Sequence, residues 1–322
     1  MVARSRSIVR IVTPGTRRAN NGNWRTAARW ASMLQGYCRV IVQSEWNGEG
    51  ADALIALHAR RSAPSIAAFH TAQPDRRIAL VLTGTDLYRD LAAGDPVAEA
   101  SLEFAHRLIA LQDDAPRLLP ARWRGKCEVI FQSARELTTA RKPREPIEAV
   151  AVGHLREEKD PRTLFEAVKL LPAGVPLRIC HIGAALDADL AKEARALARH
   201  EPRYRYLGAL PHGLTRAAIK RAHVLLHPSL MEGGANVIVE AVASGTPVLA
   251  SRMSGNVGML GRDYPGYFEV RDASALADHL VRLHADRSWL PALKKACALR
   301  APLFRPTAEA RAVRRLVADL LA

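Results

Sequence analysis

The chain has 322 residues, 48% of them hydrophobic and 25% charged, which is enough apolar material for two packed domains of about 150 residues each. These figures exclude a peptide hormone, a disulfide-stapled miniprotein and a wholly disordered chain. Lys and Arg outnumber Asp and Glu by 47 to 32, and the resulting net charge of +15 favours anionic ligands.

The first half of the chain alternates short apolar runs with amphipathic stretches, a pattern typical of strands and helices around a parallel sheet. The first amphipathic stretch is Trp24–Gln35. The expected strands are Ile8–Thr13, Arg39–Gln43, Ala53–His58, Ile78–Thr83, Arg107–Leu111 and Glu128–Gln132. The polar segment Thr138–Pro146, with two prolines, then indicates a linker.

A second α/β series follows this linker. Its expected strands are Glu148–Val152, Leu177–Ile182, Tyr204–Leu207, Val224–His227 and Pro247–Ser251. Its expected helices are Arg162–Leu171, Ala188–Arg199, Leu214–Ala222, one that opens near Ala235, and Pro306–Leu321. We therefore expect an α/β protein of two doubly wound, Rossmann-like domains facing a cleft, residues 1–145 and 146–305, with the C-terminal helix 306–322 packing back on the first domain.

The cysteines and the apolar runs bear on where the protein resides. Cys38, Cys127, Cys180 and Cys297 lie far apart without a CxxC pair, which predicts reduced thiols and no metal site. Arg10 breaks the first apolar run, which is too short for a signal peptide, and no later run approaches the roughly 18 apolar residues of a membrane span. We expect a cytoplasmic protein without a membrane span.

The most informative segment is His227–Ser251, with the sequence HPSLMEGGANVIVEAVASGTPVLAS. A buried strand ends in His-Pro-Ser, a Gly-Gly turn follows Glu232, and a helix then begins whose first backbone amides favour an anion or a hydroxyl-rich ligand. Glu240 lies eight positions after Glu232, and a carboxylate accepts two adjacent hydrogen bonds from a vicinal diol. Either glutamate by itself is more often a solvated residue, but the whole pattern predicts a site for a sugar or nucleotide.

This segment resembles the E-x7-E donor motif of retaining, glycogen-synthase-like (GT4-type) glycosyltransferases of the GT-B fold, including the tail EAVASGTPVLAS. The resemblance covers the second half of the chain. It implies that Glu240 holds the ribose of the donor nucleotide. The residues that it implies for the donor hexose are Glu232, Gly233, Gly234, Ala235 and Asn236.

A second donor segment, VGHLREEKDP at Val152–Pro161, follows the first strand of the second domain. Relatives usually read GRL-x3-KG there, with the Arg and the Lys on the donor diphosphate. Lys159 matches this pattern, whereas His154 stands in place of the Arg and Asp160 in place of the Gly. Arg156 or His154 is expected to supply the missing contact. Without the resemblance, a Lys-Asp-Pro sequence is more often a helix cap.

In the first domain, the loop and helix start Thr13–Trp30 carries arginines and asparagines suited to a small oxyanion. The expected acceptor-binding residues there are Arg17, Arg18, Asn20, Asn23 and Arg25, although Arg17 and Arg18 also fit solvated loop charges.

Two further strand ends of the first domain read ALHARRSA and LTGTDLYRD. Glycosyltransferases of this type often place a catalytic histidine after the latter strand, but Thr-Gly-Thr-Asp stands there in this chain. We therefore expect Thr85 to contact the acceptor, and His58 and Asp86 to orient the acceptor or water.

Together, NNGNWRTA, ALHARRS, LTGTDLYRDL and VGHLREEKDP are similar to the selenosugar synthases of selenoneine biosynthesis. This resemblance implies transfer of the sugar of UDP-N-acetylglucosamine (UDP-GlcNAc) or UDP-glucose to the selenium of selenophosphate, with release of UDP and phosphate. It implies no cofactor, and functional coupling to an enzyme that produces selenophosphate. The residues expected to be catalytic are Lys159, Glu232, His58 and Asp86. Because selenophosphate is already an anionic nucleophile, the transfer requires no strong general base.

Three alternatives remain at this point. The first is a conventional glycosyltransferase with a hydroxyl acceptor. The second is an isomerase or hydrolase of UDP-GlcNAc, which requires a cluster of carboxylates in the first domain, where only Asp86 and Asp90 are apparent. The third is a basic nucleic-acid-binding protein, which we do not expect because the chain has no basic helix with interleaved aromatics, no RNP motif and no zinc knuckle.

Overall fold

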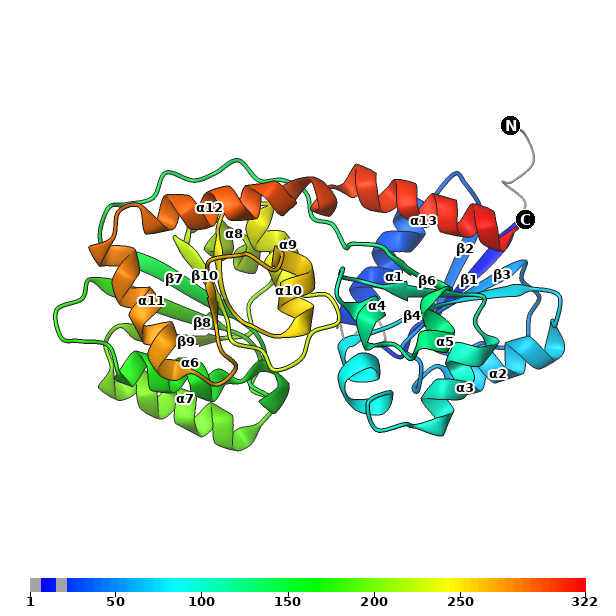
Figure 1. The fold of residues 1–322 in the computed structure, drawn as a ribbon, viewed down its shortest axis with the longest axis horizontal. Coiled ribbons are helices and arrows are strands. Elements are labelled where there is room, and N and C mark those ends of the chain that lie inside the picture. Colours follow the sequence, from blue (N-terminus) through cyan, green and yellow to red (C-terminus); the bar gives the residue numbers. More distant parts are fainter. Residues whose placement is uncertain (1–6, 16–21) are drawn as a thin grey trace. The chain divides into compact units, whose positions relative to one another are not determined.

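The structure is a computed structural model, and it describes residues 7–15 and 22–322. Its contacts divide the chain into two compact units, each an α/β unit with a six-stranded sheet (Figure 1). The first unit comprises Met1–Gln132, Glu232–Gly234 and Pro306–Ala322, and the second comprises Ser133–Met231 and Ala235–Arg305.

The sheet of the first unit is wholly parallel, with the strand order β2-β1-β3-β4-β5-β6. Its strands are β1 (Ile8–Val12), β2 (Arg39–Gln43), β3 (Ala53–Leu57), β4 (Arg77–Val81), β5 (Arg107–Ala110) and β6 (Cys127–Val129). All five residues of β3 are buried, as expected of a central strand that is covered on both faces. This double burial explains why the strand appears in the sequence as one continuous apolar run.

Helices cover both faces of this sheet. They are α1 (Gly22–Met33), α2 (Ala63–Ala72), α3 (Pro96–Phe104), α4 (Ala115–Leu118), α5 (Ala121–Arg124) and α13 (Pro306–Leu320). Trp30 of α1 and Val313 of α13 belong to one apolar cluster with the sheet, and Phe69 of α2 and Leu102 of α3 belong to the other. The C-terminal helix α13, red in Figure 1, is therefore an integral part of the first unit.

A buried carboxylate joins α13 to α1. Glu309 is only 1% exposed, and its carboxylate accepts hydrogen bonds from Trp30 Nε1 and from Arg29 Nε, both at 2.8 Å. A charge removed from water is costly unless partners of this kind satisfy it. The pairing therefore fixes how α13 packs on α1.

The sheet of the second unit is also parallel, with the order β12-β11-β10-β7-β8-β9. Its strands are β7 (Ile147–Val152), β8 (Leu177–Ile182), β9 (Tyr204–Gly208), β10 (Val224–His227), β11 (Val248–Ser251) and β12 (Tyr267–Phe268). Its helices are α6 (Pro161–Lys169), α7 (Ala188–His200), α8 (His212–Arg221), α9 (Asn236–Val242), α10 (Ser254–Leu260), α11 (Ala273–Ala285) and α12 (Trp289–Arg300).

In both sheets the direction of strand addition reverses at one point. In the first unit it lies between β1 and β3, and in the second between β7 and β10. Open α/β sheets bind ligands beside such a reversal, outside the carboxyl ends of the strands. The loops after these four strands are therefore where each unit is expected to hold its ligand.

The segment 133–145 differs from expectation, because its contacts place it in the second unit and not in the first. Lys142 Nζ donates to the carbonyl oxygen of Ala222 and to Thr246 Oγ1. Burial, with the nearby charge of Lys294, lowers the pKa of Lys142 to about 8. The segment is thus anchored, although its composition is that of a linker.

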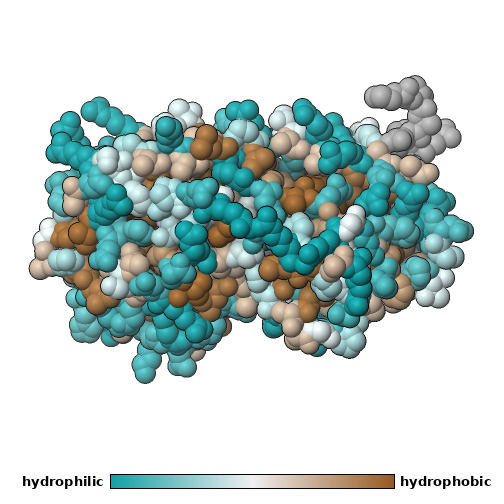
Figure 2. All heavy atoms as spheres, viewed as in Figure 1, coloured by the Kyte–Doolittle hydropathy of each residue, from teal (hydrophilic) through white to brown (hydrophobic). Residues whose placement is uncertain are grey.

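The state of the thiols and the character of the surface can be described directly from the structure. All four cysteines are unpaired, and burial raises the pKa of Cys38 and of Cys297 to about 11, so both are weak nucleophiles. Among the described residues, no helix has the length and apolar character that crossing a membrane requires. Hydrophilic residues predominate on the face drawn in Figure 2, with apolar residues in scattered groups.

Candidate active site

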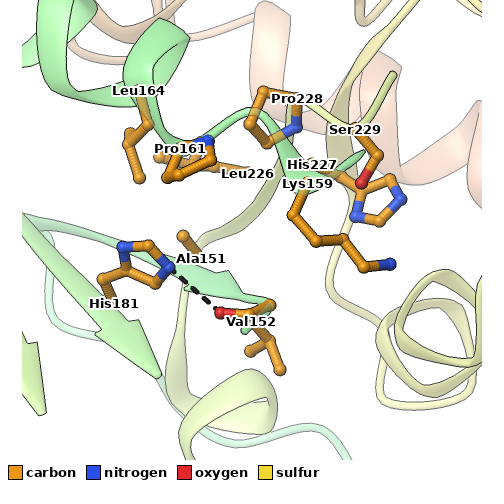
Figure 3. A pocket seen from close by; sticks show the side chains of 11 residues that line it. Ala151, Val152, Lys159, Pro161, Leu164, His181, Leu226, His227, Pro228 and Ser229 are labelled. Atoms are coloured by element: carbon orange, nitrogen blue, oxygen red, sulfur yellow. Dashed lines mark hydrogen bonds between the residues drawn. The ribbon is translucent and has the colours of Figure 1, made fainter. Parts of the chain in front are cut away.

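A pocket opens at the reversal point of the second unit, where the ends of β7 and β10 lie side by side (Figure 3). Its walls come from these two strand ends, from β8 and from the start of α6. The lining residues are Ala151, Val152, Gly153, Lys159, Pro161, Leu164, His181, Leu226, His227, Pro228 and Ser229. The pocket thus joins two segments singled out in the sequence, the one around Lys159 and the strand end at His227.

The loop after β7 is packed tightly against the end of β8. A Cβ atom on Gly183 would lie 1.9 Å from the carbonyl oxygen of Gly153, so only glycine fits there. His154 Nδ1 accepts a hydrogen bond of 2.9 Å from the backbone amide of Ala184. His154, an expected donor-binding residue, therefore also fixes the loop to the neighbouring strand end.

Lys159 ends a short 3-10 turn, Glu157–Lys159, and its half-buried side chain lines the pocket. Asp160 has φ = 45°, the left-handed conformation that glycine adopts most easily and that Asp tolerates. This conformation is compatible with the Gly that the resembled motif has at that position. The Asp160 carboxylate also accepts a 2.6 Å hydrogen bond from Thr163 Oγ1 and caps α6. Arg156 is exposed, with its Nε 3.8 Å from the carboxylate of Glu158.

Sequence reasoning missed His181, which lines the pocket from β8. Its Nδ1 accepts from the Tyr204 hydroxyl at 2.8 Å, and its Nε2 donates to the carbonyl oxygen of Gly153 at 3.2 Å. Burial lowers the pKa of His181 to about 4, so the imidazole is neutral at pH 7. It therefore supports the Gly153 loop and adds no positive charge to the pocket.

The two motif glutamates are both nearly buried, Glu232 at 8% and Glu240 at 9% exposure. Glu240 lies in the second turn of α9, which begins at Asn236 directly after Ala235. His212, the first residue of α8, donates from Nε2 to Glu240 Oε1 at 2.6 Å. This contact orients the carboxylate. No local sequence pattern indicates this contact, because His212 is 28 residues upstream of Glu240.

The turn Glu232–Gly234 belongs to the first unit by its contacts. A Cβ atom on Gly84 would lie 2.8 Å from the amide nitrogen of Gly233, and one on Gly233 would lie 2.4 Å from the amide nitrogen of Gly84. Both positions therefore require glycine. This close backbone approach accounts for the glycine in the Thr-Gly-Thr-Asp sequence.

On the acceptor side, Asn23 and Arg25 lie in the first turn of α1 and are half-buried. Three other expected acceptor residues, Arg17, Arg18 and Asn20, lie outside the described residues. The roles of all five stay predictions.

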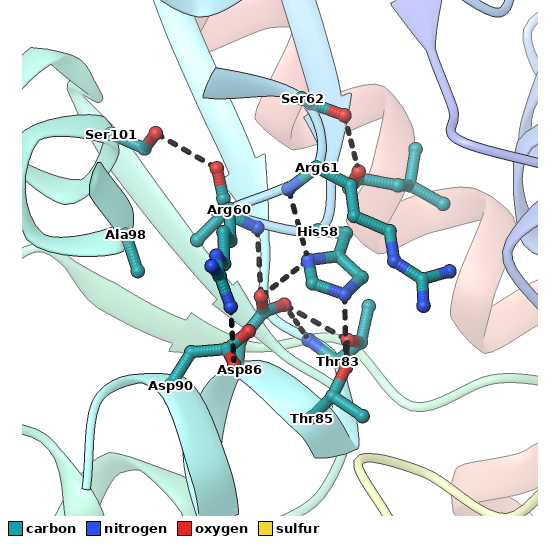
Figure 4. Close-up of polar contacts among 12 residues, drawn as sticks. His58, Arg60, Arg61, Ser62, Thr83, Thr85, Asp86, Asp90, Ala98 and Ser101 are labelled. Atoms are coloured by element: carbon teal, nitrogen blue, oxygen red, sulfur yellow. Dashed lines mark hydrogen bonds and ion pairs between the residues drawn. The ribbon is translucent and has the colours of Figure 1, made fainter. Parts of the chain in front are cut away.

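His58, Thr85 and Asp86 meet at the carboxyl ends of β3 and β4 (Figure 4). His58 Nδ1 is 2.6 Å from Asp86 Oδ1, and His58 Nε2 is 2.9 Å from Thr85 Oγ1. His58 and Asp86 are also close to Asp90, and one ligand atom from each of the three lies within 4.8 Å of the other two. The same cluster is thus suited either to proton transfer or to cation binding.

The family model described as glycosyl transferases group 1 matches residues 135–299. The O-antigen chain mannosyltransferase B of Escherichia coli is 26% identical over 144 residues, 44% of this chain and 38% of the relative. The amylovoran biosynthesis glycosyltransferase AmsK of Erwinia amylovora is 28% identical over 227 residues, 68% of this chain and 54% of the relative. The chain thus spans about half the length of these curated relatives or less.

Several solved structures match almost the whole chain, among them a sucrose-phosphate synthase and HepE. Sucrose-phosphate synthase from Thermosynechococcus elongatus has a TM-score of 0.79 at 18% identity, with 98% of this chain and 99% of that chain covered. HepE of Anabaena, in complex with UDP and glucose, has a TM-score of 0.74 at 15% identity, with 98% of each chain covered. At these identities the likeness shows the fold, two Rossmann-like units of the GT-B type. With the family model matching half of its residues, the chain belongs to the group 1 glycosyltransferases.

Proposed function

We propose that this chain transfers the sugar of a UDP-sugar, UDP-GlcNAc or UDP-glucose, to the selenium of selenophosphate. The products are a 1-selenosugar, UDP and phosphate, and selenophosphate is supplied by a separate enzyme. The observation that carries the donor half of this proposal is the buried, oriented Glu240 of the E-x7-E motif. Its carboxylate is positioned by His212 on the first turn of α8.

The donor assignment rests on the pocket of the second unit. Lys159 is the cation expected to offset the charge that grows on the leaving UDP, since a fixed positive group at a developing anion lowers the barrier. Glu240 is assigned to the ribose diol and Glu232 to the donor hexose. The complex of HepE with UDP and glucose, a neighbour in fold, supports a UDP-sugar as the donor class.

The acceptor assignment rests on the first unit and on the resemblance of its motifs. Arg25 and Asn23 are placed at the start of α1, where charge-assisted hydrogen bonds suit the phosphoryl oxygens of selenophosphate. A neutral sugar acceptor would not use that charge.

A second candidate function, transfer to a hydroxyl acceptor, is favoured by one observation. The His58–Asp86 pair with the Thr85 hydroxyl is an arrangement that can remove a proton from an alcohol. By their names, the two curated relatives described above are a mannosyltransferase of the O-antigen chain and a glycosyltransferase of amylovoran biosynthesis.

The test is a panel of UDP-sugars, each with selenophosphate, with a simple alcohol or sugar, or with no acceptor, in which released UDP is measured. We expect selenophosphate-dependent UDP release with UDP-GlcNAc or UDP-glucose, and its loss in Lys159→Ala but not in Lys192→Ala, a lysine of α7 outside the pocket. UDP release only with the alcohol or sugar would favour the second candidate. UDP release or sugar isomerisation without any acceptor would favour a hydrolase or isomerase.

A further inference from the structure

The cluster at the ends of β3 and β4 is built around an unusual backbone conformation. His58 directly follows β3 and has φ = 74°, in the left-handed region that a residue with a Cβ rarely adopts. Such strain persists only where surrounding contacts enforce it, and it is concentrated at functional sites. Here it places the imidazole, only 2% exposed, against Asp86 from the next strand end.

The carboxylate of Asp86 is completely buried, and it serves as an acceptor for several donors. Oδ1 faces His58 Nδ1 at 2.6 Å and accepts from the Ala59 amide at 3.0 Å. Oδ2 accepts from the Thr83 amide at 2.8 Å and from Thr83 Oγ1 at 2.9 Å. His58 Nδ1 also lies 3.4 Å from the backbone amide of Arg61, which would donate to it. The 2.6 Å contact with the acceptor-only carboxylate is much the shorter of the two and favours the imidazole proton on Nδ1.

With its proton on Nδ1, the imidazole presents Nε2 as an acceptor. The Thr85 hydroxyl lies 2.9 Å from that nitrogen, so it donates its proton there. Thr85 is half-buried and retains some exposed surface, whereas His58 and Asp86 are buried. The hydroxyl of Thr85 is therefore the point at which a substrate can reach this chain of hydrogen bonds (Figure 4).

This proton acceptor is unexplained by the first chemical step of the proposed function. Selenophosphate is an anion before it attacks the sugar, so no proton has to be removed from it. Water, in contrast, is a weak nucleophile that requires a base. The product of the first step carries selenium bonded both to the sugar and to phosphorus, and water has to cleave the bond to phosphorus before the selenosugar is released.

We infer that Thr85 is a catalytic residue for this hydrolytic step, with His58 and Asp86 as positioning residues that act through it. The inference rests on the proposed function. The water oxygen forms a bond to phosphorus while the phosphorus–selenium bond breaks, and the electron pair of that bond leaves with selenium as a selenolate. The water proton passes to Thr85 Oγ1, and the Thr85 proton passes to His58 Nε2. Asp86 stabilises the resulting imidazolium.

Arg61 is an exposed cation close to His58 in the sequence. Arg61 follows His58 by three residues, and within the described ranges no carboxylate lies at ion-pair distance from it. Its guanidinium is therefore suited to hold the phosphoryl oxygens while water attacks.

Cation binding is the competing interpretation of this cluster. Asp90 is 2% exposed, and its Oδ2 has no hydrogen-bond partner among the described residues. However, Asp90 Oδ1 already accepts from Arg89 Nε at 2.9 Å, and Arg60 lies 4.0 Å away, so the cluster contains its own cations. The donors around Asp86 also occupy the lone pairs that a metal would need. The observations therefore favour proton transfer.

The experiment compares Thr85→Val, Thr85→Ser and wild type with UDP-sugar and selenophosphate, measuring released UDP and released phosphate separately. Thr71→Val is the matched control, because the Thr71 hydroxyl only bonds within α2. For Thr85→Val we expect the ratio of phosphate released to UDP released to fall at least tenfold below that of wild type, whatever the change in UDP release itself. A species with the mass of the glycosyl selenophosphate should accumulate. Thr85→Ser should restore phosphate release, and Thr71→Val should match wild type.

The outcomes separate the inference from the proposed function. Normal UDP release with unchanged phosphate release in Thr85→Val would overturn the inference alone, as would an equal fall of both rates. Loss of phosphate release on dialysis against EDTA, or in Asp90→Asn, would replace the relay by a metal site. If the wild type releases no UDP with selenophosphate, the proposed function fails and the inference fails with it.

Discussion

Replacement of Glu240 by Ala is expected to weaken UDP binding about 10- to 150-fold. Glu240 Oε1 already accepts a 2.6 Å hydrogen bond from His212 in the absence of ligand, so part of the carboxylate is occupied before UDP arrives. We therefore count the net loss of one charge-assisted hydrogen bond to the ribose, about 1.5–3 kcal/mol. At about 1.4 kcal/mol per factor of ten, this loss corresponds to the stated range in Kd.

The assay is isothermal titration calorimetry of UDP with the wild type, Glu240→Ala, His212→Ala and the control Glu166→Ala. Glu166 is an exposed glutamate of α6 that pairs with Lys169, so its removal should leave Kd unchanged. His212→Ala should change Kd by less than Glu240→Ala does, because His212 orients the carboxylate and is not assigned to the ligand. A Kd for Glu240→Ala within twofold of wild type would refute the assignment of Glu240 to the ribose.

Three further predictions concern the framework of the two units. Glu309→Ala should lower the free energy of unfolding by about 3 kcal/mol in denaturant titrations, because it leaves the Trp30 indole N–H and the Arg29 guanidinium without their buried acceptor. A loss below about 1 kcal/mol would contradict this expectation. Burial lowers the pKa of His181 to about 4 from an ordinary value near 6.5, so its contribution to stability is complete above pH 6.5 and is lost as the pH falls toward 4. Over that interval the free energy of unfolding should fall more for wild type than for His181→Gln, and an equal fall in both would contradict this assignment. Gly183→Ala would place a Cβ atom 1.9 Å from the Gly153 carbonyl oxygen, so it should lower the melting temperature and weaken UDP binding, and an unchanged Kd would show that this loop does not shape the donor site.

Fully buried strands such as β3 and β10 were predictable because burial on both faces makes them continuous apolar runs. Leu177–Ile182 and Val224–His227 have the bounds expected from the sequence. Helix starts were less accurate, since α8 begins at His212 and not at Leu214. Pro211 precedes that start and ends the extended segment before it, a signal that the apolar pattern by itself does not contain.

The segment 133–145 shows why unit boundaries are harder to predict. Its charged and proline-rich composition is that of a linker, but Lys142 is held by the carbonyl of Ala222 and by Thr246, and a Cβ atom on Gly245 would meet the Thr139 methyl group at 2.5 Å. These partners are about 80 to 100 residues away in the chain. The local sequence of the segment therefore does not indicate this packing.

The residues of the candidate sites also differ in how far the sequence could predict them. The E-x7-E motif is local, so Glu232 and Glu240 could be singled out directly. In contrast, the contact between His212 and Glu240, and the chain of hydrogen bonds through His58, depend on tertiary structure and, for His58, on a positive φ. The sequence identified His58, Thr85 and Asp86 as separate candidates, and the structure describes the hydrogen bonds that connect them.

The most direct test of the central claim is mass spectrometry of the sugar product after incubation of the wild-type protein with UDP-GlcNAc or UDP-glucose and selenophosphate. Our account predicts a hexose or N-acetylhexosamine carrying one selenium, recognised by the selenium isotope pattern, in an amount equal to the UDP released. No such product should form when phosphate replaces selenophosphate. Efficient glycosylation of an alcohol or lipid acceptor, with no selenium-containing sugar, would contradict the account.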